Sequence, residues 1–139
     1  MLVEDDPGQA LLIKRVLGRA QLMNPICAFS DGDQALSYLQ GQDPSFTGDT
    51  PALILLDLHL PGKSGLEILE WIRAQDAFRG VPVLMLSAST ESKDIDRAFE
   101  LGADSYLIKP VAFDALVDLV TSLGLPWVIL SREGTVARA

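Results

Sequence analysis

The stretch Leu53-Ile54-Leu55-Leu56-Asp57-Leu58-His59-Leu60-Pro61-Gly62 determines the predicted fold. Its apolar beginning and the turn-forming residues Pro61 and Gly62 at its end are typical of a short strand buried on both faces. Asp57 then lies at the carboxyl end of that strand, on the edge where open α/β sheets bind ligands. Taken alone, Asp57 is equally compatible with a residue that only caps the following turn, because aspartate is common in turns.

Apolar segments and amphipathic segments alternate along the chain on both sides of this strand. We expect strands at residues 1–4, 26–29, 52–57, 81–87 and 105–108. Helices are expected between them, with Asp6 as the N-cap of the first and a capping box beginning at Ser64 in the third. The residues expected to face the sheet are Leu12, Ile13, Val16, Leu17 and Ala20, then Ala35, Leu36 and Leu39, then Leu66, Leu69 and Ile72, then Ile95, Ala98 and Phe99 within a helix over 91–101, and finally Phe113, Leu116, Val117, Val120 and Leu123. Five strand–helix repeats predict a parallel sheet with helices on both faces.

Composition restricts the classes of function. The 139 residues suffice for one domain with a core, and their net charge of −8 argues against direct binding to nucleic acid, whose phosphates attract Lys and Arg. The single cysteine, Cys27, cannot form an internal disulfide, which favours a reducing compartment. No apolar run reaches the ~18 residues of a membrane span, and no basic leader is visible. We therefore expect a cytoplasmic protein that does not enter a membrane.

Five polar residues are predicted to share one rim of the sheet, because the carboxyl ends of parallel strands face the same edge. They are Glu4 and Asp5 after the first strand, Asp57 after the third, Ser87 after the fourth and Lys109 after the fifth. Three carboxylates at one place repel each other unless one takes a proton or a cation binds. A hard cation held by a few carboxylates is typical of Mg²⁺. The simpler interpretation is that Ser87 merely ends a strand and that Lys109 is a solvated turn residue.

Four motifs, taken in order, resemble the receiver domain of two-component response regulators. They are Val3-Glu4-Asp5-Asp6, Leu55-Leu56-Asp57-Leu58-His59-Leu60-Pro61-Gly62, Leu86-Ser87-Ala88 and Tyr106-Leu107-Ile108-Lys109-Pro110. The resemblance covers residues 1–124. It implies a flavodoxin-like (βα)₅ fold with strand order 2-1-3-4-5, and a phosphoacceptor signalling domain rather than an enzyme.

The resemblance also implies how the phosphoryl group is received. Asp57 would be the phosphoacceptor, taking the group from a sensor histidine kinase. Asp5 and Asp57 would bind Mg²⁺ directly, Glu4 would act through water, and the backbone carbonyl of His59 would be a further ligand. His59 and Ser89 lie two residues past the phosphoacceptor and the switch hydroxyl, so we expect them to tune the lifetime of the phosphoryl group.

A second set of residues is implied to bind and sense the new phosphoryl group. Ser87 and the adjacent Ala88 would contact it, and Lys109 would pair with its charge. The bond between Lys109 and Pro110 is expected to be cis. Tyr106 would be an aromatic switch that reorients when Ser87 moves, although a tyrosine here could also be ordinary packing.

Three other functions fit parts of the same pattern. A haloacid-dehalogenase-like phosphatase would use Asp57 as nucleophile, but its second aspartate is replaced by His59 and no cap insertion is present. Gly62-Lys63-Ser64 imitates the end of a P-loop, but the glycine five residues earlier is replaced by Asp57. A flavin carrier would need a phosphate loop where Glu4-Asp5-Asp6 stands. The phosphatase remains the alternative to the receiver.

The tail, residues 125–139, is too short to fold alone, so we expect a stand-alone receiver that signals by contact or acts as a phosphate sink. Its apolar segment, with Trp127, Val128, Ile129 and Leu130, either folds back or crosses to a second copy as a dimerisation arm. The last helix carries Asp114 and Asp118 and has no Lys or Arg, which disfavours a charge-paired dimer. The 41–51 loop and the tail resemble the small regulators encoded with bacterial phytochromes, so a phytochrome kinase is the implied partner.

Overall fold

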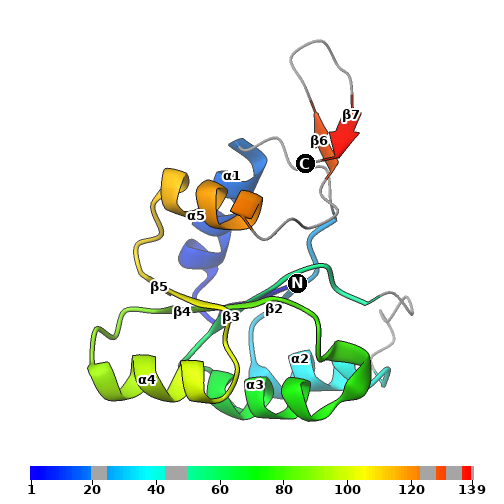
Figure 1. Ribbon diagram of the computed structural model, residues 1–139, viewed down its shortest axis with the longest axis vertical. Helices are drawn as coiled ribbons and strands as arrows, with labels where there is room; N and C mark the ends of the chain where they lie inside the picture. The colour runs from blue at the N-terminus through cyan, green and yellow to red at the C-terminus, as the bar shows by residue number, and fades with distance from the viewer. Residues whose placement is uncertain (20–24, 43–49, 123–127, 131–135, 139) are drawn as a thin grey trace.

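The computed structural model of the chain is a three-layer α/β sandwich (Figure 1). It describes residues 1–19, 25–42, 50–122, 128–130 and 136–138. The parallel sheet contains β1 (Leu2–Val3), β2 (Ala28–Phe29), β3 (Ile54–Asp57), β4 (Val83–Ser87) and β5 (Ser105–Ile108), in the order β2-β1-β3-β4-β5. Helices α1 (Pro7–Arg19) and α5 (Phe113–Ser122) cover one face, and α2 (Gly32–Leu39), α3 (Gly65–Ala74) and α4 (Ser92–Glu100) cover the other. The predicted fold and strand order are confirmed.

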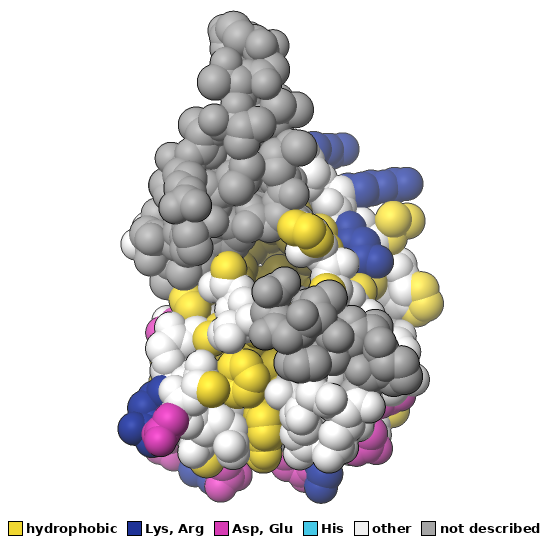
Figure 2. Space-filling view, turned by 90° about the vertical axis from the view of Figure 1, so that its right-hand side faces the viewer, with side chains coloured by type: hydrophobic (Ala, Val, Ile, Leu, Met, Phe, Trp, Pro, Cys, Tyr) yellow, Lys and Arg dark blue, Asp and Glu magenta, His cyan; other side chains and the backbone are white. Residues whose placement is uncertain are grey.

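Strand β3 lies at the centre of the sheet and carries Asp57 at its end. Leu55 pairs with Leu2 of β1 on one side and with Leu84 of β4 on the other. All residues of β3 and β4 are buried, as their continuous apolar sequence predicts. Figure 2 shows the edge where the strands begin, with hydrophobic side chains along the middle of that face and acidic ones toward the α2–α4 layer.

Side-chain caps begin the helices where the sequence predicts them. Asp6 accepts hydrogen bonds from the backbone N–H groups of Gly8, at 2.8 Å, and Gln9, at 3.2 Å. Ser64 likewise accepts from the N–H of Glu67 at 3.2 Å. Each cap satisfies a donor that the first turn of a helix leaves without a partner. The predicted caps Asp6 and Ser64 are confirmed, and for the predicted capping box the structure gives the hydrogen bond accepted by Ser64.

Two predicted core residues are exposed instead. Leu12 is 43% exposed and Phe99 is 47% exposed. In each helix the residue at the neighbouring position faces the sheet, Ile13 in α1 and Ala98 in α4, and both are buried. Because adjacent helical residues point about 100° apart, one member of a pair at the border of the contact stripe can face the sheet while the other faces solvent. The predicted inward orientation of Leu12 and Phe99 is therefore wrong.

Strands β3 and β4 begin about two residues later than the apolar runs that predict them. Pro82 explains the difference for β4, because proline has no N–H to donate to the neighbouring strand. Its carbonyl still accepts a hydrogen bond from Ile54 at 3.0 Å. A short 3₁₀ helix, η1 (Asp76–Phe78), which was not predicted, lies between α3 and β4.

Arg73 joins several segments at the edge of the sheet opposite Asp57. Its Nε donates to the carbonyl of Gly102 at 2.9 Å, and its Nη1 donates to the carbonyl of Val81 at 2.8 Å. Its Nη2 donates to Asp104 at 2.9 Å, and Asp104 also accepts from the N–H of Val83 at 2.8 Å. The end of α3, the start of β4 and the connection from α4 to β5 are thereby held together.

The tail contains an antiparallel strand pair that the sequence pattern does not predict. Strand β6 (Val128–Leu130) pairs with β7 (Val136–Arg138), with Ile129 opposite Ala137. Figure 1 draws the pair beyond α1 and α5, away from the sheet. Trp127, the aromatic residue of the predicted arm, lies outside the described residues. No helix among the described residues is long and apolar enough to cross a bilayer.

Candidate functional site

Polar side chains gather at the carboxyl ends of the central strands. Glu4 follows β1, Asp57 ends β3 and Ser87 ends β4, and all three are buried. Lys109 follows β5, and its side chain is largely buried beside them. Asp5 is exposed at the same rim. Residues that lie far apart in the chain thus meet at one place.

Lys109 bridges two of the carboxylates. Its Nζ donates to Glu4 and, at 3.0 Å, to Oδ2 of Asp57. Burial acts to lower the pKa of Lys109, but the hydrogen bonds to Glu4 and Asp57 outweigh burial and raise this pKa overall. Lys109 therefore remains charged at neutral pH and balances part of the acidic cluster.

The surroundings of Glu4 raise its pKa. Burial and the neighbouring carboxyl group of Asp57 raise the pKa of Glu4 to about 7, and Lys109 only partly opposes them. Its Oε2 is buried and has no hydrogen-bond partner among the described residues. Buried polar atoms in proteins are nearly always paired, so this oxygen is available for a ligand.

The acidic cluster could hold a divalent cation. Oxygen atoms from Glu4, Asp5 and Asp57 lie within 4.8 Å of one another. Carboxylate oxygens are the ligands that hard cations such as Mg²⁺ or Mn²⁺ prefer. The Oε2 atom of Glu4, which has no hydrogen-bond partner among the described residues, is an oxygen that could coordinate such a cation. The donor set therefore fits a hard divalent ion.

The raised pKa of Glu4 predicts how the stability of the metal-free protein depends on pH. Between the ordinary value of 4.5 and about 7, the folded protein keeps a proton that the unfolded chain has released. The contribution of Glu4 to the free energy of unfolding is therefore constant below this window and falls as pH rises through it. In Glu4→Gln the neutral amide removes this contribution.

Urea denaturation of the metal-free wild type and Glu4→Gln measures this effect. The free energy of unfolding of the wild type minus that of the variant is expected to be lower at a pH of about 8 than at about 5. An equal difference at both pH values would show that the fold does not raise the pKa of Glu4.

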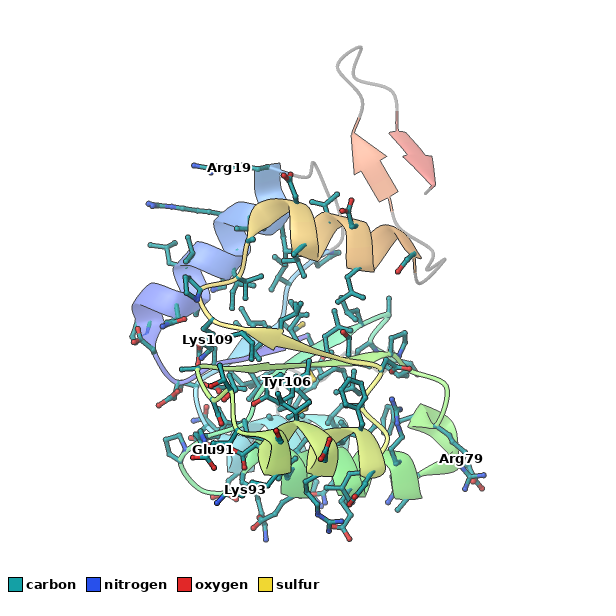
Figure 3. All side chains as sticks on the ribbon, turned by 60° about the vertical axis from the view of Figure 1, so that its left-hand side comes forward. Arg19, Arg79, Glu91, Lys93, Tyr106 and Lys109 are labelled. Atoms are coloured by element: carbon teal, nitrogen blue, oxygen red, sulfur yellow. The ribbon has the colours of Figure 1, made fainter. Side chains whose placement is uncertain are left out.

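Ser89 connects Ser87 with Tyr106. The N–H of Ser89 donates to Oγ of Ser87 at 3.0 Å, and Oη of Tyr106 donates to the carbonyl of Ser89 at 3.1 Å. Tyr106 is half-buried and packs against the main core, and Figure 3 shows it between the sheet and α4. The hydroxyl at the end of β4 is thus connected through Ser89 to an aromatic side chain by two hydrogen bonds.

Asp94 is a member of this network that sequence reasoning missed. It lies in the first turn of α4 and accepts a hydrogen bond from Oγ of Ser89 at 2.6 Å. An aspartate at the start of a helix is common for electrostatic reasons alone. The Ser89–Asp94 spacing therefore carries no signal that a motif search would detect.

A groove opens beside Asp57. It has a volume of about 540 Å³ and is lined by His59, Ala88, Ser89, Thr90, Glu91, Lys93 and Asp94. Figure 3 shows Glu91 and Lys93 below the same end of the sheet as Lys109. This volume is within the range of pockets that bind small molecules, and its lining comes from the segments that follow β3 and β4.

The backbone around Asp57 is closely constrained. The N–H of His59 donates to Oδ1 of Asp57 at 3.3 Å, and the N–H of Gly65 donates to the carbonyl of Leu58 at 3.0 Å. A Cβ on Gly65 would lie 2.0 Å from the carbonyl oxygen of Asp57, so only glycine fits there. On the other side of the site, the Lys109–Pro110 peptide bond is cis.

Comparison with known proteins identifies the family. Residues 1–121 match the family described as the response regulator receiver domain. The chain belongs to this family. Receivers are signalling domains.

Related receivers include proteins of similar length. The chain is 36% identical over 133 residues to the probable methanogenesis regulatory protein FilR2 of Methanothrix harundinacea, covering 96% of this chain and 85% of that protein. It is 32% identical over 127 residues to response regulator Rcp1 of Synechocystis, covering 91% of this chain and 86% of that protein.

Solved structures of receivers superpose well on this one. The bacteriophytochrome response regulator RtBRR has a TM-score of 0.82 and 39% identity, covering 94% of this chain and 80% of that chain. The Mn²⁺-bound form of Rcp1 has a TM-score of 0.75 and 32% identity, covering 88% of each chain. The phosphorylated cyanobacterial phytochrome response regulator RcpA has a TM-score of 0.76 and 31% identity, covering 88% of this chain and 87% of that chain.

Proposed function

We propose that Asp57 accepts a phosphoryl group from a phosphohistidine of a sensor histidine kinase. A carboxylate oxygen of Asp57 forms the new O–P bond while the P–N bond breaks, and the released imidazole takes a proton from solvent. The observation that carries the proposal is the bridge from Lys109 to Asp57 and Glu4 at a buried, acidic strand end. Phosphoryl transfer depends mainly on positioning and on charge neutralisation, and Lys109 supplies a fixed positive charge for both.

Glu4, Asp5 and Asp57 are the side chains proposed to hold Mg²⁺, with the backbone carbonyl of His59 as a further ligand. A bound divalent cation supplies neutralisation of the charge on the transferring oxygens. The unpaired Oε2 of Glu4 supports this assignment, as does the Mn²⁺-bound form of the related Rcp1. Lys109 would exchange part of its contact with the carboxylates for contact with the phosphoryl group.

The proposed response to phosphorylation begins at Ser87. Its hydroxyl and the adjacent Ala88 would bind the phosphoryl group together with Lys109. Because the N–H of Ser89 is bonded to Ser87 and its carbonyl to Tyr106, movement of Ser87 would reorient Tyr106. The chain would then signal through the changed surface or act as a phosphate sink.

The proposed partner is a sensor histidine kinase of the phytochrome class. Support comes from the similarity to RtBRR and RcpA, whose descriptions connect them with phytochromes. The net charge of −8 is in keeping with a protein partner rather than nucleic acid. A cytoplasmic location follows from the same proposal, because that is where such kinases carry their phosphohistidine.

Incubation with acetyl phosphate and Mg²⁺, followed by intact mass spectrometry, tests the proposed function. We expect one phosphoryl group per chain, located by peptide mapping at Asp57, and no gain when the cation is chelated. Steady release of inorganic phosphate from many phosphomonoesters, without a stoichiometric adduct, would contradict the proposal and favour the phosphatase alternative.

His59 and Ser89 are proposed to set the lifetime of the aspartyl phosphate. Both line the groove that opens after β3 and β4, and the N–H of His59 donates to Asp57, so these side chains would influence the approach of a water molecule to the phosphoryl group. We expect His59→Ala and Ser89→Ala to change the first-order rate of phosphate loss measurably, because each removes a polar group near the reacting atoms. Loss of phosphoryl protein is measured over time by mass spectrometry, and rates equal to that of the wild type would contradict the assignment.

The tail is proposed to mediate a homodimer, with residues 125–139 reaching a second copy. An isolated pair of strands such as β6 and β7 is marginally stable in water, so contact with a partner would stabilise it. We expect deletion of residues 125–139 to convert the dimer into a monomer, as measured by light scattering, while phosphoryl uptake is retained. An unchanged mass in solution would show that the tail is not the arm.

A further inference from the structure

Ser89 is the central residue of a hydrogen-bond network that connects the phosphoacceptor edge with α4. Its N–H, its carbonyl and its hydroxyl each have a different partner, namely Ser87, Tyr106 and Asp94. Its Oγ also accepts from the N–H of Glu91 at 3.3 Å. Ser89 is only half-buried, so packing alone does not hold it in place.

We propose that Asp94 is a positioning residue that couples the phosphoryl site to α4. Its carboxylate fixes the hydroxyl of Ser89 and thereby the backbone that lies between Ser87 and Tyr106. This inference rests on the proposed function, because it concerns how the same site is read by the rest of the domain.

The bond between Ser89 and Asp94 is strong for a partly exposed pair. The 2.6 Å distance from Oγ to Oδ2 is that of a charge-assisted hydrogen bond, which is about twice as strong as a neutral one. Asp94 is also in the first turn of α4, where the helix dipole stabilises its negative charge. The carboxylate is therefore well placed to accept.

Asp94 does not act as an ordinary helix cap. The N-cap position of α4 is Glu91, whose side chain makes no capping hydrogen bond. Asp94 instead accepts from Ser89, which precedes that N-cap by two residues. The interaction therefore joins the β4–α4 loop to the helix rather than closing the helix on itself.

The proposed coupling from Asp57 to α4 requires only hydrogen bonds that the structure contains. A phosphoryl group on Asp57 attracts the hydroxyl of Ser87, and the N–H of Ser89 is bonded to that same oxygen. A displaced Ser89 carries its hydroxyl, and with it Asp94 and the first turn of α4. Without the Asp94 carboxylate, only the longer hydrogen bond from the N–H of Glu91 joins the hydroxyl of Ser89 to α4, so Ser87 and Ser89 can move with a smaller effect on the helix.

Amide hydrogen exchange with and without beryllium fluoride and Mg²⁺ tests this coupling, because the fluoride complex imitates a phosphoryl group on a carboxylate. In the wild type we expect the ligand to change exchange both at residues 87–89 and at residues 91–95. In Asp94→Ala the change at residues 91–95 should fall several-fold, and the change at residues 87–89 should persist. Asp94→Asn, which keeps an acceptor oxygen, should retain part of the response.

Asp96→Ala is the matched control. It removes the same charge from the same helix, and Asp96 is exposed and makes no ion pair or side-chain hydrogen bond with the described residues. Its response should equal that of the wild type. If Asp94→Ala does not fold, as judged by circular dichroism, Ser89→Ala removes the same hydrogen bond from the other partner, together with the longer one from the N–H of Glu91, and should give at least the same loss at residues 91–95.

Different results would contradict the proposed function and the proposed role of Asp94. A wild type that does not respond at residues 87–89 would overturn the proposed function, and the coupling with it. A wild type that responds, together with an Asp94→Ala variant that responds equally at residues 91–95, would overturn the role of Asp94 alone. A loss in Asp96→Ala as large as that in Asp94→Ala would also overturn it, because helix charge rather than the Ser89 bond would then be responsible.

Discussion

Asp57→Asn is expected to take up no phosphoryl group from acetyl phosphate in the presence of Mg²⁺. Asparagine has nearly the same shape as aspartate, but its amide is not a nucleophile and carries no charge. The variant should fold, because it removes one of three carboxylates that repel each other at the rim. Lys109 would keep its contact with Glu4. Uptake is measured as the fraction of chains that gain one phosphoryl group in the intact mass spectrum.

Asp114→Asn provides the control for this measurement. Asp114 is exposed on α5 and makes no ion pair or side-chain hydrogen bond with the described residues, so the same loss of charge there should leave uptake unchanged. Uptake by Asp57→Asn at a rate near that of the wild type would show that another side chain is the acceptor.

Lys109→Met should slow phosphorylation on the order of a hundredfold or more, the loss typical of removing one positioned donor from a charge-stabilising site. Methionine fills a similar volume but has no charge, so no positive charge after β5 would neutralise the oxygens of the transferring phosphoryl group. The carboxylates of Glu4 and Asp57 would also lose their shared donor. Glu4 would then hold its proton to a higher pH, because the interaction that lowers its pKa is gone.

The rate is measured from the growth of the phosphoryl adduct at a fixed concentration of acetyl phosphate. Lys63→Met is the matched control, because Lys63 is exposed and, among the residues that the structure describes, its side chain forms only a 4.0 Å surface ion pair with Glu67. Such surface pairs contribute little, so its rate should stay within about twofold of the wild type. Equal rates for Lys63→Met and Lys109→Met would remove Lys109 from the mechanism.

The sheet and its order could be predicted because several local signals agree. Continuous apolar runs around Leu55 and Leu84 indicate strands buried on both faces, and the caps Asp6 and Ser64 indicate where helices begin. The orientation of residues at the border of an apolar stripe could not be predicted. Whether Phe99 or Ala98 faces the sheet depends on how α4 is rotated, and packing sets that rotation.

The candidate site, like the fold, could be predicted only in part. The meeting of Glu4, Asp57 and Lys109 is a consequence of parallel strands that end at one edge, so it could be anticipated from the order of elements. Which oxygen of Glu4 contacts Lys109 and which stays unpaired depends on side-chain rotamers. The bond from Ser89 to Asp94 likewise depends on the path of a loop, which no periodic pattern describes. Strand pairing in the tail was also missed, because three-residue strands give too short an alternation to detect.

The guanidinium of Arg73 gives α4 one anchored end. It binds the carbonyl of Gly102, just past that helix, and Asp104 beyond it, whereas the opposite end is joined to Ser89 by two hydrogen bonds, one to Asp94 and a longer one from the N–H of Glu91. A helix of nine residues is about 13 Å long at 1.5 Å per residue. Any rearrangement of α4 is therefore a swing about a pivot near Gly102, and its amplitude grows toward Ser92.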